Sequence, residues 1–369
     1  MSTARVLVLG GYGHFGTRIC RALTRYPFID LLIAGRDAAG AGALQRELGA
    51  RHRGIALDCN APGLAARIKA EGASVVVHTC GPFQGQGYHV AEACIAAGAH
   101  YVDLADGRAF VAGISALDAQ AREHNVLITS GASTLPALSS AVIDEHRAHF
   151  QRIDAIDISI APGQQTPRGV ATLEAVLSYC GKPFEVWEEG RWRTVHGWQD
   201  VRRFNYPDFG ARWLARCDVP DLQLLPERYT GVRHVRFDAG LELAIGQAAF
   251  WLLAALVRVG VVGEPKKFAR AMHRWGPWFD RFGTGTGGMH IGITGEGRDN
   301  KPARVDWHLV ARRGHGPEIP CVAAIVVARE LAAGRISARG ALPCMGLMTL
   351  AQFGEAVSNL DIEWRTVFA

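Results

Sequence analysis

The sequence predicts an α/β protein: a doubly wound parallel sheet at the N-terminus, followed by a second α+β domain with a mixed or antiparallel sheet. Six short apolar runs alternate with helical patterns before Ser130, which is typical of a parallel sheet covered on both faces. A glycine-rich turn follows the first run and opens a helix, as in a nucleotide-binding βαβ unit. After Ser130 the alternation stops, which indicates a second domain.

The first domain should contain six strands in the order in which the apolar runs occur. Helical patterns of about 10–15 residues separate the runs, as expected for crossover connections between parallel strands. We place the end of this domain at residue 131, within a boundary region that spans 125–140. The expected strands cover 5–10, 31–34, 54–57, 74–78, 100–104 and 126–129.

The second domain, predicted over 132–340, carries antiparallel signals. A turn at Glu189 and Gly190 separates two strand-like arms, and the arms 289–295 and 303–312 flank the turn GRDN. A helix over 136–149 and a strand over 153–160 precede these hairpins. We expect the last segment, 341–369, to pack back on the first domain.

Residues 11–16 form the pattern G-x-G-x-x-G directly after a strand and at the start of a helix. Gly11 would permit the tight turn, Gly13 the close approach of the backbone to a pyrophosphate, and Gly16 close packing of the helix on the strand. The helix N-terminus offers free N–H groups to phosphates. We therefore predict a Rossmann-type dinucleotide site that uses Gly11, Tyr12, Gly13, His14, Phe15 and Gly16.

The end of the second strand favours NADP over NAD. An NAD site usually has an acidic residue there for the ribose 2′-hydroxyl, whereas this chain has Arg36, which suits a 2′-phosphate. Asp37 follows directly and keeps NAD open as the cofactor. Asp58, at the end of the third strand, either bonds the adenine amine or has a local structural role.

The fourth and fifth strand units, VVVHTCGPFQGQGYHVAEACIAAGAHYVDLADG, and the later AREHNVLITSGASTLPALSSAVID resemble the saccharopine dehydrogenase-like oxidoreductase family. The resemblance is dense over residues 4–145 and weaker beyond. It implies a nicotinamide-binding first domain, a second domain with substrate contacts and a homodimer surface, and a C-terminal segment that folds back. It places Thr79, Cys80, Gly81 and Pro82 along the ribose and nicotinamide of the cofactor.

One stretch departs from the family pattern. Members that form saccharopine resemble G-L-D-P-G-I-D-H, with an acidic residue near the substrate amine, whereas residues 131–136 here are GASTLP. An amino-acid imine substrate is therefore in doubt. Some family members look like enoyl reductases that act on lipid-linked polyketides, and an apolar substrate would suit the Trp-rich second domain.

Three ionisable residues at or after the fifth strand, Tyr101, Asp103 and Asp106, are the candidate catalytic groups. Asp103 could equally cap the edge of the core, and His78 at the end of the fourth strand is more often a structural residue. The predicted activity is that of an NAD(P)-dependent oxidoreductase, in particular an NADPH-dependent reductase of a small-molecule C=N, C=O or C=C bond. Because no proton donor is evident, the alternative is a non-catalytic NADP-binding redox sensor or membrane-surface scaffold.

Composition limits the class of protein, its partners and the compartment in which we expect it. Hydrophobic residues make up 49% and charged residues 20% of the chain, which excludes a mostly disordered protein. The net charge of +5 comes without a Lys/Arg run, so we expect no nucleic-acid partner. The eight cysteines are dispersed, which predicts no metal site, and the absence of a signal-peptide pattern predicts a cytoplasmic protein.

The longest apolar run, residues 248–257, is too short to cross a bilayer, which needs about 20 residues. We expect it to form a buried helix. Peripheral membrane contact is the less favoured alternative, since the basic segment 266–282 that follows carries Trp275, Trp278 and Phe279.

Overall fold

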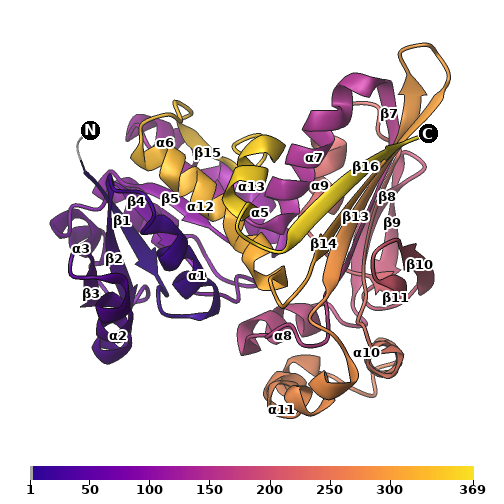
Figure 1. Cartoon of the computed structure of the whole chain (residues 1–369), viewed down its shortest axis with the longest axis horizontal. Helices are drawn as coiled ribbons and strands as arrows, with labels where there is room; N and C mark the ends of the chain where they lie inside the picture. Colours follow the sequence, from indigo (N-terminus) through magenta and orange to yellow (C-terminus); the bar gives the residue numbers. More distant parts are fainter. Residues whose placement is uncertain (1–2) are drawn as a thin grey trace. The chain divides into compact units, whose positions relative to one another are not determined.

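The computed structural model describes residues 3–369 and divides into two compact units (Figure 1). Unit 1 contains the chain up to Leu138 together with Glu318–Ala356. Unit 2 contains Ser139–Pro317 together with Val357–Ala369. Each unit is built around its own seven-stranded sheet, and the predicted α/β fold class is confirmed.

Unit 1 is a parallel sheet with the strand order β15-β6-β5-β4-β1-β2-β3. The direction of winding reverses between β1 and β4, which is where such sheets bind ligands beyond the carboxyl ends of their strands. All six predicted strands are present. The strands are β1 (Ala4–Leu9), β2 (Ile29–Gly35), β3 (Arg53–Ala56), β4 (Val75–His78), β5 (His100–Asp103), β6 (Leu127–Ser130) and β15 (Gly340–Pro343).

Helices cover both faces of the first sheet because its strands are apolar on both sides. Leu7 and Leu9 of β1 lie in one core cluster with residues of α3 and α4, whereas α12 packs against β1, β4 and β5. The helices of unit 1 are α1 (His14–Leu23), α2 (Ala38–Leu48), α3 (Leu64–Ala70), α4 (His89–Ala97), α5 (Arg108–Gly113), α6 (Asp118–Glu123), α12 (Ile319–Ala332) and α13 (Leu350–Val357).

The boundaries of the units differ from those expected. We expected all of 132–340 in the second domain, yet α12 lies in unit 1 because twelve of its fourteen residues are buried there. The segment 341–369 is divided between the units. β15 adds to the edge of the first sheet beside β6, whereas β16 (Ile362–Phe368) pairs with β14 in unit 2.

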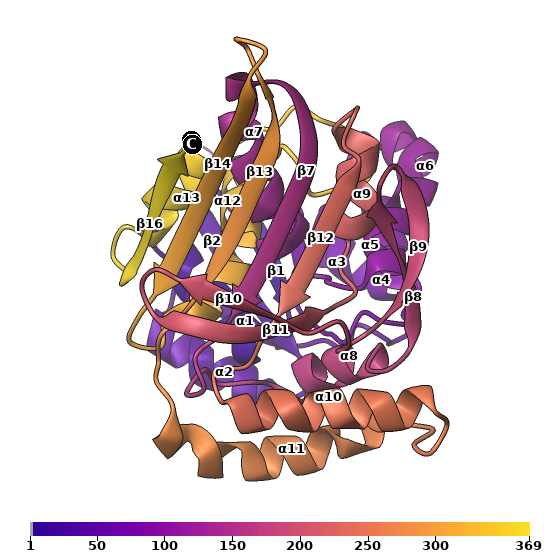
Figure 2. The same cartoon turned by 90° about the vertical axis from the view of Figure 1, so that its right-hand side faces the viewer.

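Unit 2 is a mixed sheet with the strand order β10-β11-β12-β7-β13-β14-β16 (Figure 2). Only β12 and β7 run parallel among its strand pairs, so the predicted mixed sheet is confirmed. Its strands are β7 (Phe150–Ala161), β10 (Arg202–Tyr206), β11 (Gly210–Arg216), β12 (His234–Ala239), β13 (Gly287–Gly297), β14 (Pro302–Ala311) and β16. A separate hairpin pairs β8 (Pro183–Glu188) with β9 (Arg191–His196). The helices are α7 (Ser139–His146), α8 (Val170–Ser178), α9 (Asp221–Arg228), α10 (Ala244–Arg258) and α11 (Ala269–Trp275).

The apolar helix α10 forms as expected, but its predicted burial is wrong. Of its fifteen residues, Gln247 and Ala254 are the two that are buried. The apolar pattern specifies a helix without specifying what covers it. No helix in the part of the chain that the structure describes has the length and apolar character needed to cross a membrane.

Candidate functional site

The chain leaves β1 through a turn of glycines and enters α1 at His14. Gly10 has a φ of 77°, so the left-handed residue of this turn is Gly10 rather than Gly11, to which we had assigned the tight turn. Gly11 is constrained instead by β2, since a Cβ there would lie 2.9 Å from Cγ2 of Ile33. A Cβ on Gly16 would lie 2.1 Å from the carbonyl oxygen of Gly10. The helix therefore packs directly on the turn.

The N-terminus of α1 has the character of an anion site. Gly13 is the N-cap, no side chain caps the helix, and its first turn has no acidic residue. The N–H groups of His14, Phe15 and Gly16 have no acceptor within the helix, as in the first turn of any helix. These N–H groups and the helix dipole attract phosphate. The residues thus fit the pyrophosphate of a dinucleotide.

Two oppositely charged residues, Arg36 and Asp37, follow β2, and only the carboxylate of Asp37 has hydrogen-bond partners in the described residues. The Asp37 carboxylate accepts hydrogen bonds from the N–H groups of Ala39 (2.9 Å) and Gly40 (3.1 Å), so it serves as the N-cap of α2. The backbone N–H of Asp37 donates to the hydroxyl of Tyr12 at 2.9 Å. Arg36 is exposed, and within residues 3–369 its guanidinium has no hydrogen bond or ion pair.

The loop after β4 is tied to the glycine turn. Thr79 Oγ1 donates to the carbonyl oxygens of Leu9 (2.8 Å) and Gly10 (3.2 Å). Gln86 Nε2 donates to the carbonyl oxygens of Cys80 (3.0 Å) and Pro82 (2.7 Å). The stretch Thr79–Pro82 therefore lies next to the glycine turn, and the family resemblance predicts that it lines a cofactor.

Cys59, His78 and Cys80 converge at the carboxyl ends of the strands. One ligand-type atom of each lies within 4.8 Å of the others, so the group could hold a metal ion. A hydrogen bond with Cys80, and a second with His78, lowers the pKa of the Cys59 thiol, while the contact with Cys59 raises the pKa of Cys80. Two sulfurs and an imidazole are ligands that zinc prefers. The sequence analysis predicted no metal site because these residues are spread over two strand ends. Because parallel strands end at the same edge of a sheet, the proximity of Cys59 to His78 and Cys80 could have been predicted from the sequence.

Asp58 and the candidate catalytic residue Tyr101 both have partners within unit 1. Asp58 Oδ1 accepts a hydrogen bond from the N–H of Asn60 at 3.0 Å. Tyr101 is fully buried, and its hydroxyl lies 3.0 Å from Nδ1 of His78. Burial, reinforced by Asp103, raises the pKa of Tyr101 well above its ordinary value.

Asp103 is also fully buried, and it holds the start of the segment after β6. Its Oδ1 accepts hydrogen bonds from Ser130 Oγ (3.0 Å) and from the N–H groups of Gly131 (2.8 Å) and Ala105 (2.9 Å). Asp106 differs from both residues, since part of its surface is exposed and its Oδ1 accepts from Gln84 Nε2 at 2.9 Å. Desolvation by the surrounding protein nevertheless raises the pKa of its carboxyl. Asp106 is therefore the candidate of the three that solvent can reach.

Unit 2 contains a second group of potential ligands, His290, Asp306 and His308. The imidazoles of His290 and His308 stack at 4.7 Å between ring centroids, and Nε2 of His290 lies 2.7 Å from Oδ1 of Asp306. Arg304 also binds both oxygens of Asp306 (2.5 and 2.9 Å). A guanidinium so close to the carboxylate opposes the binding of a cation there.

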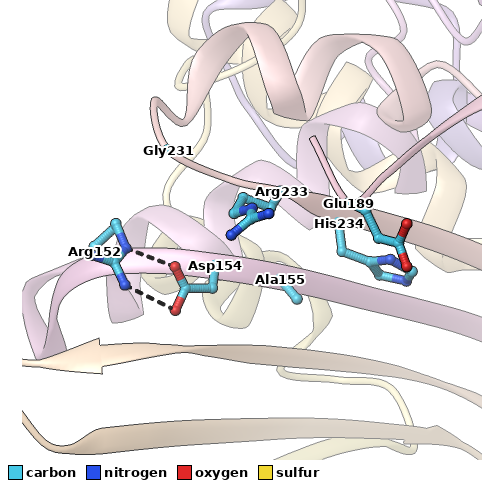
Figure 3. A pocket seen from close by; sticks show the side chains of 7 residues that line it. All are labelled: Arg152, Asp154, Ala155, Glu189, Gly231, Arg233 and His234. Carbon is cyan, nitrogen blue, oxygen red and sulfur yellow. Dashed lines mark hydrogen bonds and ion pairs between the residues drawn. The ribbon is translucent and has the colours of Figure 1, made fainter. Parts of the chain in front are cut away.

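A groove of about 670 Å³ opens on unit 2 (Figure 3). Arg152 and Asp154 pair across its wall, with 2.7 Å between Nε and Oδ1. Ligand pockets are mostly apolar, whereas these walls are charged. We assign the groove no catalytic role. Its lining residues are Arg152, Asp154, Ala155, Glu189, Gly231, Arg233 and His234.

Comparisons with known proteins agree with the geometry of unit 1. Residues 6–152 match the family model described as the saccharopine dehydrogenase NADP binding domain. The fold is similar to that of apo saccharopine dehydrogenase (L-Glu forming) from Saccharomyces cerevisiae, at 13% identity and a TM-score of 0.68, covering 99% of this chain and 100% of that one. It is also similar to homospermidine synthase from Legionella pneumophila in complex with NAD, at 8% identity and a TM-score of 0.60, covering 99% and 91%. A search of curated protein sequences found no match.

The glycine turn, the uncapped helix and the family match together define the class of protein: the chain is an NAD(P)-dependent oxidoreductase. Within that class, residues 6–152 belong to the saccharopine dehydrogenase NADP-binding domain family. The resemblance found in the sequence is confirmed for this part of the chain.

Proposed function

We propose that the protein is an NADPH-dependent reductase that transfers hydride to a C=N, C=O or C=C bond of a small-molecule substrate. The observation that carries the preference for NADPH is the pair Arg36 and Asp37. An acidic residue that bonds the ribose of NAD needs a free carboxylate, but the Asp37 carboxylate is occupied by the N-terminus of α2. Arg36 is left as the free charge at this strand end, and it suits a 2′-phosphate.

Different segments of unit 1 would contact different parts of the cofactor. The N–H groups of the first turn of α1 would hold the pyrophosphate, and Thr79–Pro82 would line the ribose and nicotinamide. The bound cofactor would supply the hydride. Thr79 keeps the β4 loop against the glycine turn through its bonds to Leu9 and Gly10, so both parts of the cradle stay in one arrangement.

We propose Asp106 as the residue that delivers a proton to the substrate. A proton donor must come within hydrogen-bond reach of the substrate, and Asp106 is the one of the three residues with an exposed surface. Desolvation raises the pKa of its carboxyl, which favours the protonated form that can donate. Tyr101 and Asp103 are buried, so we propose that they position other groups. Tyr101 would hold the ring of His78, and Asp103 would hold the turn at Gly131.

The segment after β6 bears on the substrate. Residues 131–136 contain no carboxylate, and most of them are buried. A substrate nitrogen that needs a nearby acid has no partner in that segment. We therefore propose an apolar compound as the first substrate class to test, ahead of amino-acid imines.

The proposal is tested by titrating the protein with NADPH and NADH and following ligand fluorescence. A charge-assisted hydrogen bond contributes about 1.5–3 kcal/mol, so Arg36→Ala should weaken NADPH binding by roughly 10- to 100-fold. Its effect on NADH should be small. Arg25→Ala, which removes an exposed arginine away from the turn, is the control. Equal losses for both nucleotides in Arg36→Ala would refute the role of Arg36.

The reductase activity itself is tested by NADPH oxidation across imine, keto and enoyl substrates. Turnover with one class, and its loss in Asp106→Asn with NADPH binding unchanged, would support the assignment. Tight NADPH binding without turnover on any class would contradict the reductase and favour the non-catalytic redox sensor.

A further inference from the structure

An exposed apolar surface lies between Glu242 and Thr284 in unit 2, and we call it the α10–α11 surface. It comprises α10, α11, the loop 259–264 and the two short 3₁₀ segments Pro265–Phe268 and Gly276–Phe282. Ten of the fifteen exposed large hydrophobic side chains found within residues 3–369 belong to it. Ile245 is 71%, Trp278 66% and Phe282 62% exposed. Such a concentration marks an interaction surface rather than ordinary scatter.

Helix α10 is the clearest part of this surface. Its first charged residue is Arg258, at its last position, so it is apolar around most of its circumference. A helix of that kind is normally buried in a protein core or in a membrane, yet only Gln247 and Ala254 are buried here. Fifteen residues make a helix of about 22 Å, which is too short to span a bilayer. The helix therefore suits a position along an interface.

Basic residues accompany the apolar ones. Residues 244–282 contain six Lys or Arg and two acidic residues. Both acidic residues are engaged, since Glu264 pairs with Lys267 at 3.0 Å and Asp280 accepts a hydrogen bond from Gln164 at 3.1 Å. The guanidinium of Arg281 lies 5.4 Å from the ring of Trp278 and 4.7 Å from that of Phe282. Cations and aromatic rings are thus presented together.

The surface is held to its unit at both ends. The carboxylate of Glu242 accepts hydrogen bonds from the N–H of Gln164 (2.7 Å) and from the N–H and Oγ1 of Thr284 (both 2.8 Å). Along its length, Phe250 packs on Trp198 with 4.5 Å between ring centroids. Helices α10 and α11 lie next to each other at the lower edge of unit 2 in both views (Figures 1 and 2). The exposed rings therefore belong to two neighbouring helices and the short segments that join them.

We propose that the α10–α11 surface binds the interface of a lipid bilayer that contains anionic lipids. Trp and Phe rings favour the level of the headgroups, and Lys and Arg bind anionic headgroups. A second copy of this chain fits less well. A twofold interface would set the surface against itself, so that its cations would face cations.

The proposal is tested with the full-length protein in vesicle flotation. The two vesicle types are phosphatidylcholine alone and phosphatidylcholine with phosphatidylglycerol. We expect binding to the anionic vesicles that weakens as salt is raised, and much weaker binding to the neutral ones. Trp275→Ala with Trp278→Ala should lower the partition coefficient at least tenfold. K266E with R270E should do the same, since each cation near an anionic surface contributes on the order of fivefold. Trp192→Ala with Trp213→Ala removes two exposed rings of the same unit outside the surface, and it should bind as wild type.

Three results would overturn the proposal. The first is no flotation of the wild-type protein with either vesicle. The second is an equal loss in the control variant and in the surface variants. The third is a wild-type protein that does not bind vesicles, together with surface variants whose oligomeric mass by light scattering is lower than that of wild type. That result would assign the surface to contact with a second copy of the chain. The variant K266E with R270E changes no aromatic side chain. It therefore still tests the proposal if the tryptophan variant fails to fold.

Discussion

Replacing Gly16 by alanine places a methyl group where the structure has no room for it. The new Cβ would lie 2.1 Å from the carbonyl oxygen of Gly10 and 2.8 Å from Cα of Gly11. Comfortable contacts between heavy atoms are about 3.5–4.0 Å, so the new Cβ and the turn have to move apart by roughly 1.5 Å. Overpacking of this kind costs about 1–3 kcal/mol of folding stability. The N–H groups that we expect to hold the pyrophosphate move with the helix.

The measurement combines an NADPH titration with thermal unfolding. We expect Gly16→Ala to weaken NADPH binding by about tenfold or more, since three charge-assisted hydrogen bonds lose their geometry together. Gly42→Ala is a matched control, because the nearest atom to its new Cβ is 3.6 Å away, on the flexible side chain of Arg46. That change lies inside α2 and should gain up to about 1 kcal/mol of stability without altering affinity. Wild-type affinity and stability in Gly16→Ala would refute the assigned role of the turn.

Two further predictions follow from perturbed ionisable groups. Burial raises the pKa of the Asp221 carboxyl to about 7, so the folded state holds this proton more tightly than the unfolded chain, in which the pKa is about 3.9. Stability should therefore fall as pH rises from about 4 to about 7, by at most about 1.4 kcal/mol per pH unit. Asp221→Asn should remove that part of the slope in denaturant titrations, and an unchanged slope would contradict the assignment. The lowered pKa of Cys59 predicts that iodoacetamide at pH 6 modifies it before the other cysteines. Peptide mass spectrometry checks the order, NADPH should slow the modification, and faster labelling of another cysteine would count against the thiolate.

The first sheet could be predicted because its signals are local. The apolar runs of β1, β2 and β4 each lie between helical patterns, and the structure has strands at all six expected places. β15 could not be predicted in the same way. It has four residues, one of them Pro343, and it gains its strand character only by pairing with β6, more than two hundred residues earlier. The mixed sheet of unit 2 was predicted from its turns, whereas β16 at its edge was not.

The candidate site shows the same division between local and distant signals. The glycine turn and Arg36 lie beside the strands that position them, so they could be proposed as cofactor contacts from the sequence alone. Burial is a property of the packed structure, so residue types and spacing could not separate the buried Tyr101 and Asp103 from Asp106. The grouping of Cys59 with His78 and Cys80 depends on how two loops meet above the sheet. For α10, periodicity could not distinguish a helix in a core from one on a surface.

The discontinuity of unit 1 has a consequence for how the protein is made. The strands up to β6 leave the ribosome first, but α12 and β15 follow only after the whole of Ser139–Pro317. At about 5–20 residues per second, that interval lasts roughly ten to forty seconds. During this time the apolar side chains of β1, β4 and β5 that α12 later covers have no covering helix. Biosynthesis of the nucleotide-binding unit therefore includes a waiting state with an open sheet edge and an uncovered face, to which a holding chaperone can bind.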